Sequence, residues 1–228
     1  MKIETHLHTL NGSPCGCVPA ETVPRVYAEL GYDAVAITNH YTKYICEEFY
    51  PQLYGKSADP AECFFKEYER AKDAAKDLPI QIFFGMEIAC RADSYQEFML
   101  YGFNEEFLQK NSRIYDLNQK ELFAFCEENG LFMYQTHPFR DGILTGDARH
   151  MHGAEVYNGH PEHRNHNEKA LKMAELRRLK QLSGSDFHKL GGEGRGGVVT
   201  SIPVTDGKSF AAYLKANQPT LIRTETDL

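Results

Sequence analysis

The sequence predicts an α/β fold built on a parallel sheet. Short apolar stretches alternate with helical patterns along the 228 residues, and repeated strand–helix units favour a parallel sheet that is either closed as a barrel or open and doubly wound. Polar side chains follow the predicted strands, where parallel α/β folds gather their catalytic groups. The length is that of one sizeable core, so we expect a single domain over residues 1–228.

The elements follow from apolar periodicity and from Gly and Pro punctuation. We expect strands over residues 1–7, 34–38, 80–84, 98–103, 131–135, 154–157, 181–184 and 198–202. Helices are expected over residues 19–30, 60–76, 117–129, 163–179 and 208–216. Residues 41–59 form the longest stretch without a clear pattern and could be a lid over a site.

Composition excludes several classes of protein. The net charge of −7 argues against a general nucleic-acid binder, which would show a basic face, although bound metal ions could still attract a phosphate. No apolar run approaches the roughly 18 to 20 residues that span a bilayer, and no signal-peptide core follows Lys2. We therefore expect a cytoplasmic protein without membrane association, whose six cysteines are reduced thiols; the oligomeric state is not predicted.

Residues of the types that commonly bind metals lie at or just past the ends of the predicted strands. They are His6, His8, His40, Glu87, His137, Asp186 and His188. In the H-x-H pair both imidazoles point to the same side of a strand, with Cα atoms roughly 6 to 7 Å apart, and the D-x-H pair repeats this geometry. Imidazole and carboxylate ligands suit Zn²⁺, Mn²⁺ or Fe²⁺ better than they suit a structural Cys₄ zinc site.

Five segments, taken together, resemble the successive motifs of the polymerase-and-histidinol-phosphatase (PHP) superfamily. They are Thr5-His6-Leu7-His8-Thr9, Ala36-Ile37-Thr38-Asn39-His40, Gly85-Met86-Glu87, Thr136-His137-Pro138 and Gly184-Ser185-Asp186-Phe187-His188. The resemblance covers nearly the whole chain. It implies a distorted seven-stranded (β/α) barrel that holds up to three metal ions, in a family of phosphatases, other phosphoesterases and polymerase-linked exonucleases.

The resemblance assigns ligands to two or three divalent ions (Zn, Mn or Fe). The first would be held by His6, His8, Glu87 and Asp186, the second by Glu87 and His137, and the third by His40, His188 and Cys15. Among these residues it implies catalytic roles for Glu87, Asp186 and His188. Cys15 is the loop residue nearest to the place where relatives have His or Asp, and it is either a thiolate ligand or a structural thiol.

Two departures from the family pattern affect the metal positions. Met99 stands where relatives have a further His ligand, and a thioether is a poor ligand for a hard divalent ion. Asn39 replaces the usual Asp before His40; it could orient an imidazole by hydrogen bonding but adds no negative charge. Occupancy of all three positions therefore stays open.

The substrate side of the site is less clearly marked. Arg195, in the glycine-rich stretch 191–197, could reach a phosphate, or the stretch could be a simple turn. His160 and Arg164 belong to a basic patch that either contacts substrate or is solvated. The same two alternatives apply to Arg140, which follows the His137 motif.

The predicted function is a metal-dependent phosphoesterase acting on a small phosphorylated metabolite or nucleotide. Clustered divalent ions lower the pKa of water, so no nucleophilic side chain is required, and the sequence has neither a G-x-S-x-G elbow nor a P-loop. One alternative is an exonuclease or oligonucleotide phosphodiesterase on the same metals. Another is a metal-binding regulatory protein that has lost catalysis.

Overall fold

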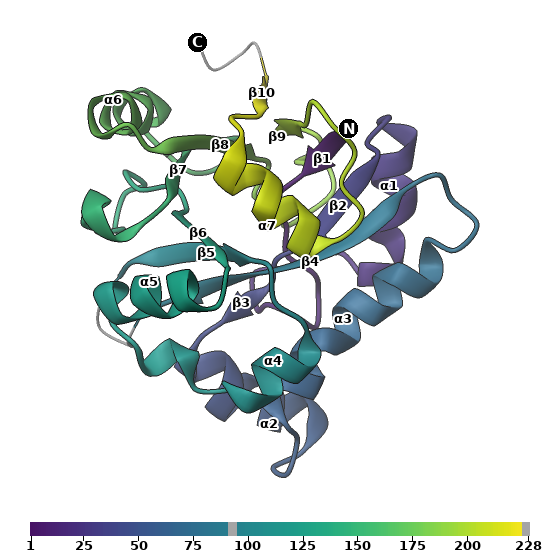
Figure 1. Cartoon of the computed structure of the whole chain (residues 1–228). Coiled ribbons are helices and arrows are strands. Elements are labelled where there is room, and N and C mark those ends of the chain that lie inside the picture. The colour runs from purple at the N-terminus through teal and green to yellow at the C-terminus, as the bar shows by residue number, and fades with distance from the viewer. Residues whose placement is uncertain (91–94, 225–228) are drawn as a thin grey trace.

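A single curved sheet forms the centre of the molecule, as the computed structural model shows for residues 1–90 and 95–224. Its strands lie in the order β10-β9-β1-β2-β4-β5-β6-β7-β8, and β3 pairs with β4 outside this path (Figure 1). The two ends of the path approach each other, because Ser183 on β8 donates a hydrogen bond to the carbonyl of Ile222 on β10 and accepts one from the amide of Gly197 on β9. The sheet is thus a nearly closed barrel, and the predicted α/β fold is confirmed.

The described residues contain ten strands. They are β1 (Lys2–Glu4), β2 (Ala34–Ile37), β3 (His40–Tyr41), β4 (Gln81–Ala89), β5 (Glu97–Tyr101), β6 (Phe132–Gln135), β7 (Gly153–Asn158), β8 (Lys180–Gly184), β9 (Gly196–Val199) and β10 (Thr220–Arg223). The implied count of seven is not confirmed. β4 runs five residues beyond the predicted strand end, so Glu87 lies within a strand, whereas β1 ends before His6.

The sheet is mixed, whereas the sequence favoured a parallel one. β1, β2, β3 and β4 are parallel neighbours, as are β6, β7 and β8. β5 is antiparallel to both β4 and β6, and β9 is antiparallel to both β1 and β10. The main reason is chain length: too few residues separate β4 from β5 for a crossover helix, so the chain can only return antiparallel.

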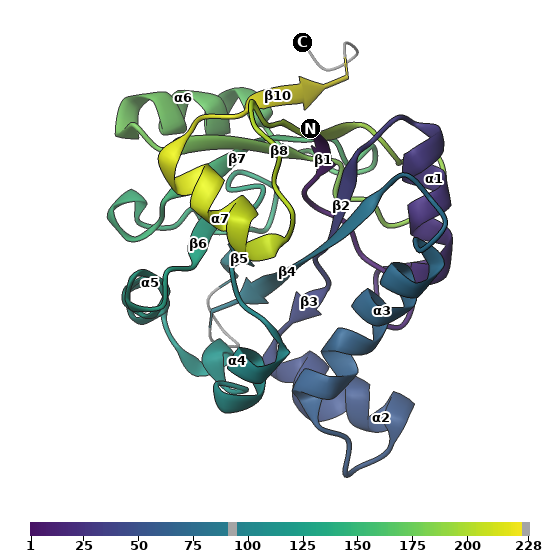
Figure 2. The ribbon, with the colours of Figure 1, turned by 45° about the vertical axis from the view of Figure 1, so that its right-hand side comes forward.

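Helices cover the outside of the barrel (Figures 1 and 2). They are α1 (Val23–Glu29), α2 (Tyr50–Tyr54), α3 (Pro60–Ala74), α4 (Glu105–Lys110), α5 (Gln119–Glu128), α6 (Asn167–Arg177) and α7 (Gly207–Ala216). Their starts are set by local chemistry: Asp59 accepts hydrogen bonds from the first amides of α3, and Asn118 forms a capping box with Glu121 in α5. No helix in residues 1–90 and 95–224 combines the length and the apolar character that a membrane crossing needs.

Two predicted segments differ in the structure. The helix expected from residue 163 begins only at Asn167, because His166 takes a left-handed backbone conformation (φ 49°) that a helix cannot include. Residues 41–59 contain a π-helical turn (Ile45–Phe49) followed by α2, and Tyr41 and Tyr50 are fully buried in the core beneath them. This segment is therefore part of the packed fold.

Candidate metal centre

Eight side chains predicted as metal ligands meet at one end of the barrel. Seven of them, together with Glu97, form overlapping groups, and the ligand atoms within each group lie within 4.8 Å of one another. The groups are His6–His8–Glu87, His6–His137–Asp186, His8–Cys15–His188 and Glu87–Glu97–His137. His40 joins them, with Nδ1 3.1 Å from Glu87 Oε2. Residues from the beginning, the middle and the end of the chain therefore share one site.

The ligand atoms at the centre of the cluster are spaced closely enough to share a metal ion. His6 Nε2 and His8 Nε2 are 3.2 Å apart. Each of them lies 3.3–3.4 Å from Glu87 Oε2 and from Asp186 Oδ1. Four ligand atoms placed about 2.0 to 2.1 Å from a central ion, as Zn²⁺ requires, are separated by roughly 3.3 to 3.4 Å. Five of the six distances among these four atoms therefore suit ligands of one shared ion.

The outer nitrogens of both imidazoles are held by hydrogen bonds, which fixes the direction of the inner ones. His6 Nδ1 donates to Glu155 Oε1 at 2.9 Å, and both side chains are fully buried. His8 Nδ1 donates at 3.2 Å to Ser13 Oγ, whose own proton goes to Asn39. The two Nε2 atoms therefore face each other, an arrangement that a cation between them stabilises.

Asp186 is held from the side away from the imidazoles. Arg140 and Asn158 both donate to its Oδ2, leaving Oδ1 directed at the histidines. Burial alone would raise the pKa of this carboxyl, but His6 and Arg140 hold it well below its usual range. The backbone of Asp186 is in the left-handed region (φ 50°), a strained conformation of the kind found at functional sites.

The other oxygen of Glu87 faces a second group of ligands. Oε1 accepts a 2.6 Å hydrogen bond from Thr136 Oγ1 and lies 3.0 Å from His137 Nε2. The same His137 nitrogen is 3.7 Å from Glu97 Oε2, a carboxylate that the sequence reasoning missed. Met99 pairs in register with Glu87 but is fully buried in the apolar interior of the barrel.

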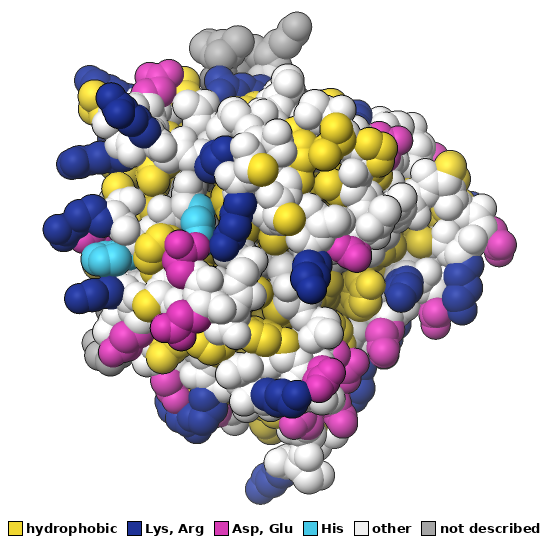
Figure 3. Space-filling view, in the orientation of Figure 1, with side chains coloured by type: hydrophobic (Ala, Val, Ile, Leu, Met, Phe, Trp, Pro, Cys, Tyr) yellow, Lys and Arg dark blue, Asp and Glu magenta, His cyan; other side chains and the backbone are white. Residues whose placement is uncertain are grey.

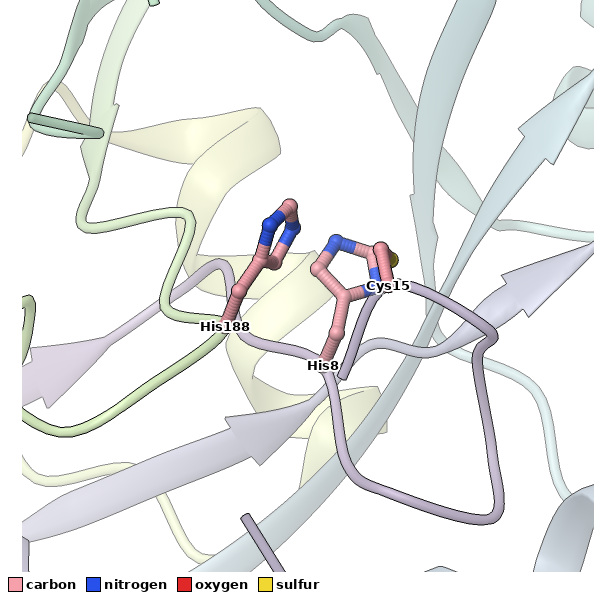
Figure 4. A group of neighbouring side chains, drawn as sticks. All are labelled: His8, Cys15 and His188. Atoms are coloured by element: carbon pink, nitrogen blue, oxygen red, sulfur yellow. The ribbon is translucent and has the colours of Figure 1, made fainter. Parts of the chain in front are cut away.

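A third group surrounds the sulfur of Cys15 (Figure 4). Its thiol lies close to the rings of His8, His40 and His188. Burial would raise the pKa of the thiol, but the charge of His8 and hydrogen bonds from His188 and His40 lower it to about 4. Conversely, the pKa of His40 is raised to about 10 and that of His188 to about 9, because Glu87, Asp186 and the Cys15 thiolate outweigh the effect of burial.

Several buried ring nitrogens lack a hydrogen-bond partner within the described part of the chain. They are His40 Nδ1, His137 Nδ1 and His188 Nε2. Such groups are costly unless a ligand satisfies them. Two of them, His40 Nδ1 and His188 Nε2, lie 3.1 Å from a carboxylate oxygen, close enough for both atoms to bind one cation. The donor set therefore fits divalent metal ions.

Known structures share this architecture, although no family model matches the chain and no curated protein is similar to it in sequence. A two-domain Bacteroides vulgatus protein containing a predicted PHP-like metal-dependent phosphoesterase aligns with 99% of the chain at TM-score 0.72 and 21% identity. The alignment covers 65% of that protein, so the chain spans less than two thirds of its length. The chain has the fold of the PHP-like phosphoesterases.

Two further structures support the same fold. PsfC from Pseudomonas syringae aligns over 98% of this chain and 91% of its own, with TM-score 0.70 and 17% identity. A proposed metal-dependent phosphoesterase from Bifidobacterium adolescentis aligns over 93% of this chain and 95% of its own, with TM-score 0.57 and 17% identity.

On this PHP-like barrel, the residues predicted to bind substrate lie in different surroundings. His160 is buried beside the cluster, with Nε2 3.2 Å from His188 Nδ1. Arg195 is half-buried, and its Nε donates to the carbonyl of Gly159. Arg164 is exposed on the loop before α6. Arg140 reaches the cluster itself through Asp186.

Asn39 contacts the loop that carries Ser13 and makes no hydrogen bond to an imidazole ring among the described residues. Its Oδ1 accepts from the amide of Thr9 and from Ser13 Oγ, and its Nδ2 donates to Thr9 Oγ1. The loop passes so close that a Cβ on Gly12 would lie 1.9 Å from the Asn39 side chain. Asn39 thus fixes Ser13, which in turn orients His8.

Proposed function

We propose that the chain is a metal-dependent phosphoesterase acting on a small phosphorylated metabolite or nucleotide. The observation that carries the proposal is the central group of His6, His8, Glu87 and Asp186, in which each imidazole Nε2 lies 3.3–3.4 Å from an oxygen of both carboxylates. The phosphate-ester substrate is supported by the names given to two proteins of the same fold.

Each proposed ion has a set of protein ligands, and Glu87 belongs to two of these sets. The first would be held by His6, His8, Glu87 and Asp186, the second by Glu87 and His137, and the third by His40, Cys15 and His188. Bound there, divalent ions supply Lewis-acid catalysis and lower the pKa of the attacking water.

The protein's own side chains would position the ions and the substrate for the proposed reaction. We assign catalytic roles to Glu87, Asp186 and His188, which lie next to the place where the phosphate would react. Glu87 offers one oxygen to the central group and one to His137, so it fixes the distance between two positions. Arg140 holds Asp186 in place by donating to Oδ2, the oxygen that faces away from the histidines.

We propose His160 as the substrate-binding residue with the best placement. It touches His188, and burial lowers its pKa to about 4, so its imidazole is neutral at pH 7. Arg195 and Arg164 remain proposals at the rim of the site, where a long side chain could contact the part of a substrate away from the phosphate.

A panel of phosphate esters tests the proposal. Chelator-treated protein is reloaded with Mn²⁺ or Zn²⁺, its metal content is measured, and it is assayed on sugar phosphates, amino-alcohol phosphates, nucleotides and single-stranded RNA and DNA. We expect turnover of a small monoester and none in the Asp186→Asn variant. Cleavage of oligonucleotides alone would favour an exonuclease, and metal-loaded protein without any turnover would contradict the proposal.

A further inference from the structure

The two sides of the metal cluster differ in chemistry. On one side of Glu87 the ligand group contains two carboxylates and one imidazole, from Glu87, Glu97 and His137. On the other side it contains one thiol and imidazoles, from Cys15, His8 and His188, with His40 against the His8 ring. Carboxylate oxygens suit hard ions such as Mn²⁺, whereas thiolate and imidazole suit softer ions such as Zn²⁺.

Glu97 is positioned to take the place of a ligand that the sequence lacks. Met99 and Glu97 are two residues apart on β5, so their side chains point to the same face of the sheet. Met99 pairs with Glu87, and Glu97 pairs with Ala89, two residues further along β4 toward the end where the ligands gather. Met99 is fully buried in the apolar interior, while the Glu97 carboxylate is 23% exposed and faces His137 Nε2.

The surroundings of His137 also indicate a cation-binding position beside Glu97. His137 Nδ1 is buried without a hydrogen-bond partner among the described residues, and its Nε2 lies between two carboxylates, at 3.0 Å from Glu87 and 3.7 Å from Glu97. The backbone of His137 is held in the left-handed region (φ 29°). The imidazole and the two carboxylates thus present three ligand atoms to one position, as a bound cation requires.

We infer that Glu97 completes a hard, carboxylate-rich metal position beside a soft thiolate position at Cys15, so that the site prefers two different metals: Mn²⁺ next to Glu97 and Zn²⁺ next to Cys15. The inference rests on the metal cluster of the proposed function but not on turnover. Because Zn²⁺ binds most ligand sets more tightly than Mn²⁺ does, the mixed state forms when Zn²⁺ is limiting and Mn²⁺ is in excess.

Metal counting on chelator-treated protein tests this inference. The protein is reloaded with limiting Zn²⁺ and excess Mn²⁺, desalted, and analysed for both metals, and bound Mn²⁺ is followed by electron paramagnetic resonance. We expect Glu97→Gln to weaken Mn²⁺ binding by about tenfold or more while bound Zn²⁺ is retained. Glu69→Gln, which removes the same charge from the exposed face of α3, is the matched control and should change neither metal.

The soft position is tested with Co²⁺, which gives a sulfur-to-metal charge-transfer band when a thiolate binds it. The wild-type protein and the Cys17→Ser control, which removes the exposed neighbouring thiol, should show the band. Cys15→Ser should lose the band and its preference for Zn²⁺ but keep the Mn²⁺ signal.

A second variant at the same position keeps the inference testable if Glu97→Gln fails to fold. Glu97→His replaces a hard ligand by an imidazole and should shift the second position from Mn²⁺ toward Zn²⁺. Unchanged Mn²⁺ binding in Glu97→Gln together with an unchanged metal preference in Glu97→His would overturn the inference. Two distinct metals bound without phosphate-ester turnover would instead contradict the proposed function and leave this inference standing.

Discussion

The two ends of strand β4 lie in regions of very different character. Its first residues line a groove of about 1110 Å³ between α3, α4 and α7, with Phe65, Lys72, Phe84 and Lys208 among the lining side chains. Figure 3 shows hydrophobic side chains there, flanked by Lys and acidic groups. Three residues after Phe84, about 10 Å along the strand, Glu87 belongs to the buried ligand cluster.

The difference between these regions shows that the volume of a groove does not indicate where the candidate metal ligands gather. The groove is lined by apolar side chains and by charges that water already solvates. The opposite end brings carboxylates and imidazoles together with almost no exposure, as for His6 at 0% and Asp186 at 1%. Concentrating buried ionisable groups costs folding free energy unless a bound ion offsets it, and such clusters are typical of functional sites.

The largest effect should come from removing a central ligand. His6→Ala and Asp186→Ala should each lose the first metal and lower kcat/KM by about a thousandfold or more, with the fold retained. Metal analysis and circular dichroism on both variants provide the check. Unchanged metal content in both would mean that the ligand assignment is wrong.

A smaller loss of metal affinity is expected when a ligand is kept but the hydrogen bond that orients it is weakened. Glu155→Gln replaces the oxygen that accepts from His6 Nδ1 and should weaken metal affinity by about 10- to 100-fold. A chelator competition titration measures the change. Glu175→Gln, on the exposed face of α6, is the control and should leave affinity unaltered.

Removing the metals should destabilise the protein as a whole. At a metal concentration about 100 times Kd, binding adds about 2.7 kcal/mol to the free energy of unfolding, which corresponds to roughly 5 to 10 °C in Tm for a chain of this size. Thermal unfolding with and without chelator tests this expectation. Equal Tm values would show that the cluster holds no ion.

Metal affinity should rise with pH from about 6.5 to 9. In the metal-free protein the pKa of His40 is raised to about 10 and that of His188 to about 9, so both carry protons that an incoming metal must displace. Because the pKa of Cys15 is lowered to about 4, its thiol adds nothing to this slope. Affinities measured by dye competition across this pH range test the sign; a flat profile would argue against metal binding by His40 and His188.

The smallest effect is expected in the groove. Lys72→Ala should leave metal content and kcat/KM unchanged and alter the free energy of unfolding by no more than about 0.5 kcal/mol. Denaturant titration and the same activity assay provide the measurement. A marked loss of activity would show that the groove takes part in the function.

Sequence reasoning located the parts of the site that follow a local rule. Pairs two residues apart, such as His6 with His8, share a side of the chain, and strand ends in this fold meet at one edge. Glu97 and Glu155 were missed because they lie inside predicted or observed strands and carry no motif. Each nevertheless left a signal: Glu97 shares a face with Met99, and Glu155 is a carboxylate between two buried apolar residues, Ala154 and Val156.

The mixed direction of the sheet could not be predicted in the same way. A strand's direction depends on the connection that precedes it and on how the barrel closes, neither of which leaves an apolar period in the sequence. β5 returns antiparallel because only seven residues separate it from β4, too few for a crossover helix. This reversal matters for the site, since it brings the first residue of β5, Glu97, to the end of β4 where the ligands gather.

Anomalous X-ray scattering from crystals grown with Zn²⁺ and Mn²⁺ tests the central claim most directly, because it locates each ion and identifies it. We expect a peak enclosed by His6 Nε2, His8 Nε2, Glu87 Oε2 and Asp186 Oδ1, with further peaks on either side of Glu87. Crystals of metal-loaded protein with no ion among those four atoms would contradict the account.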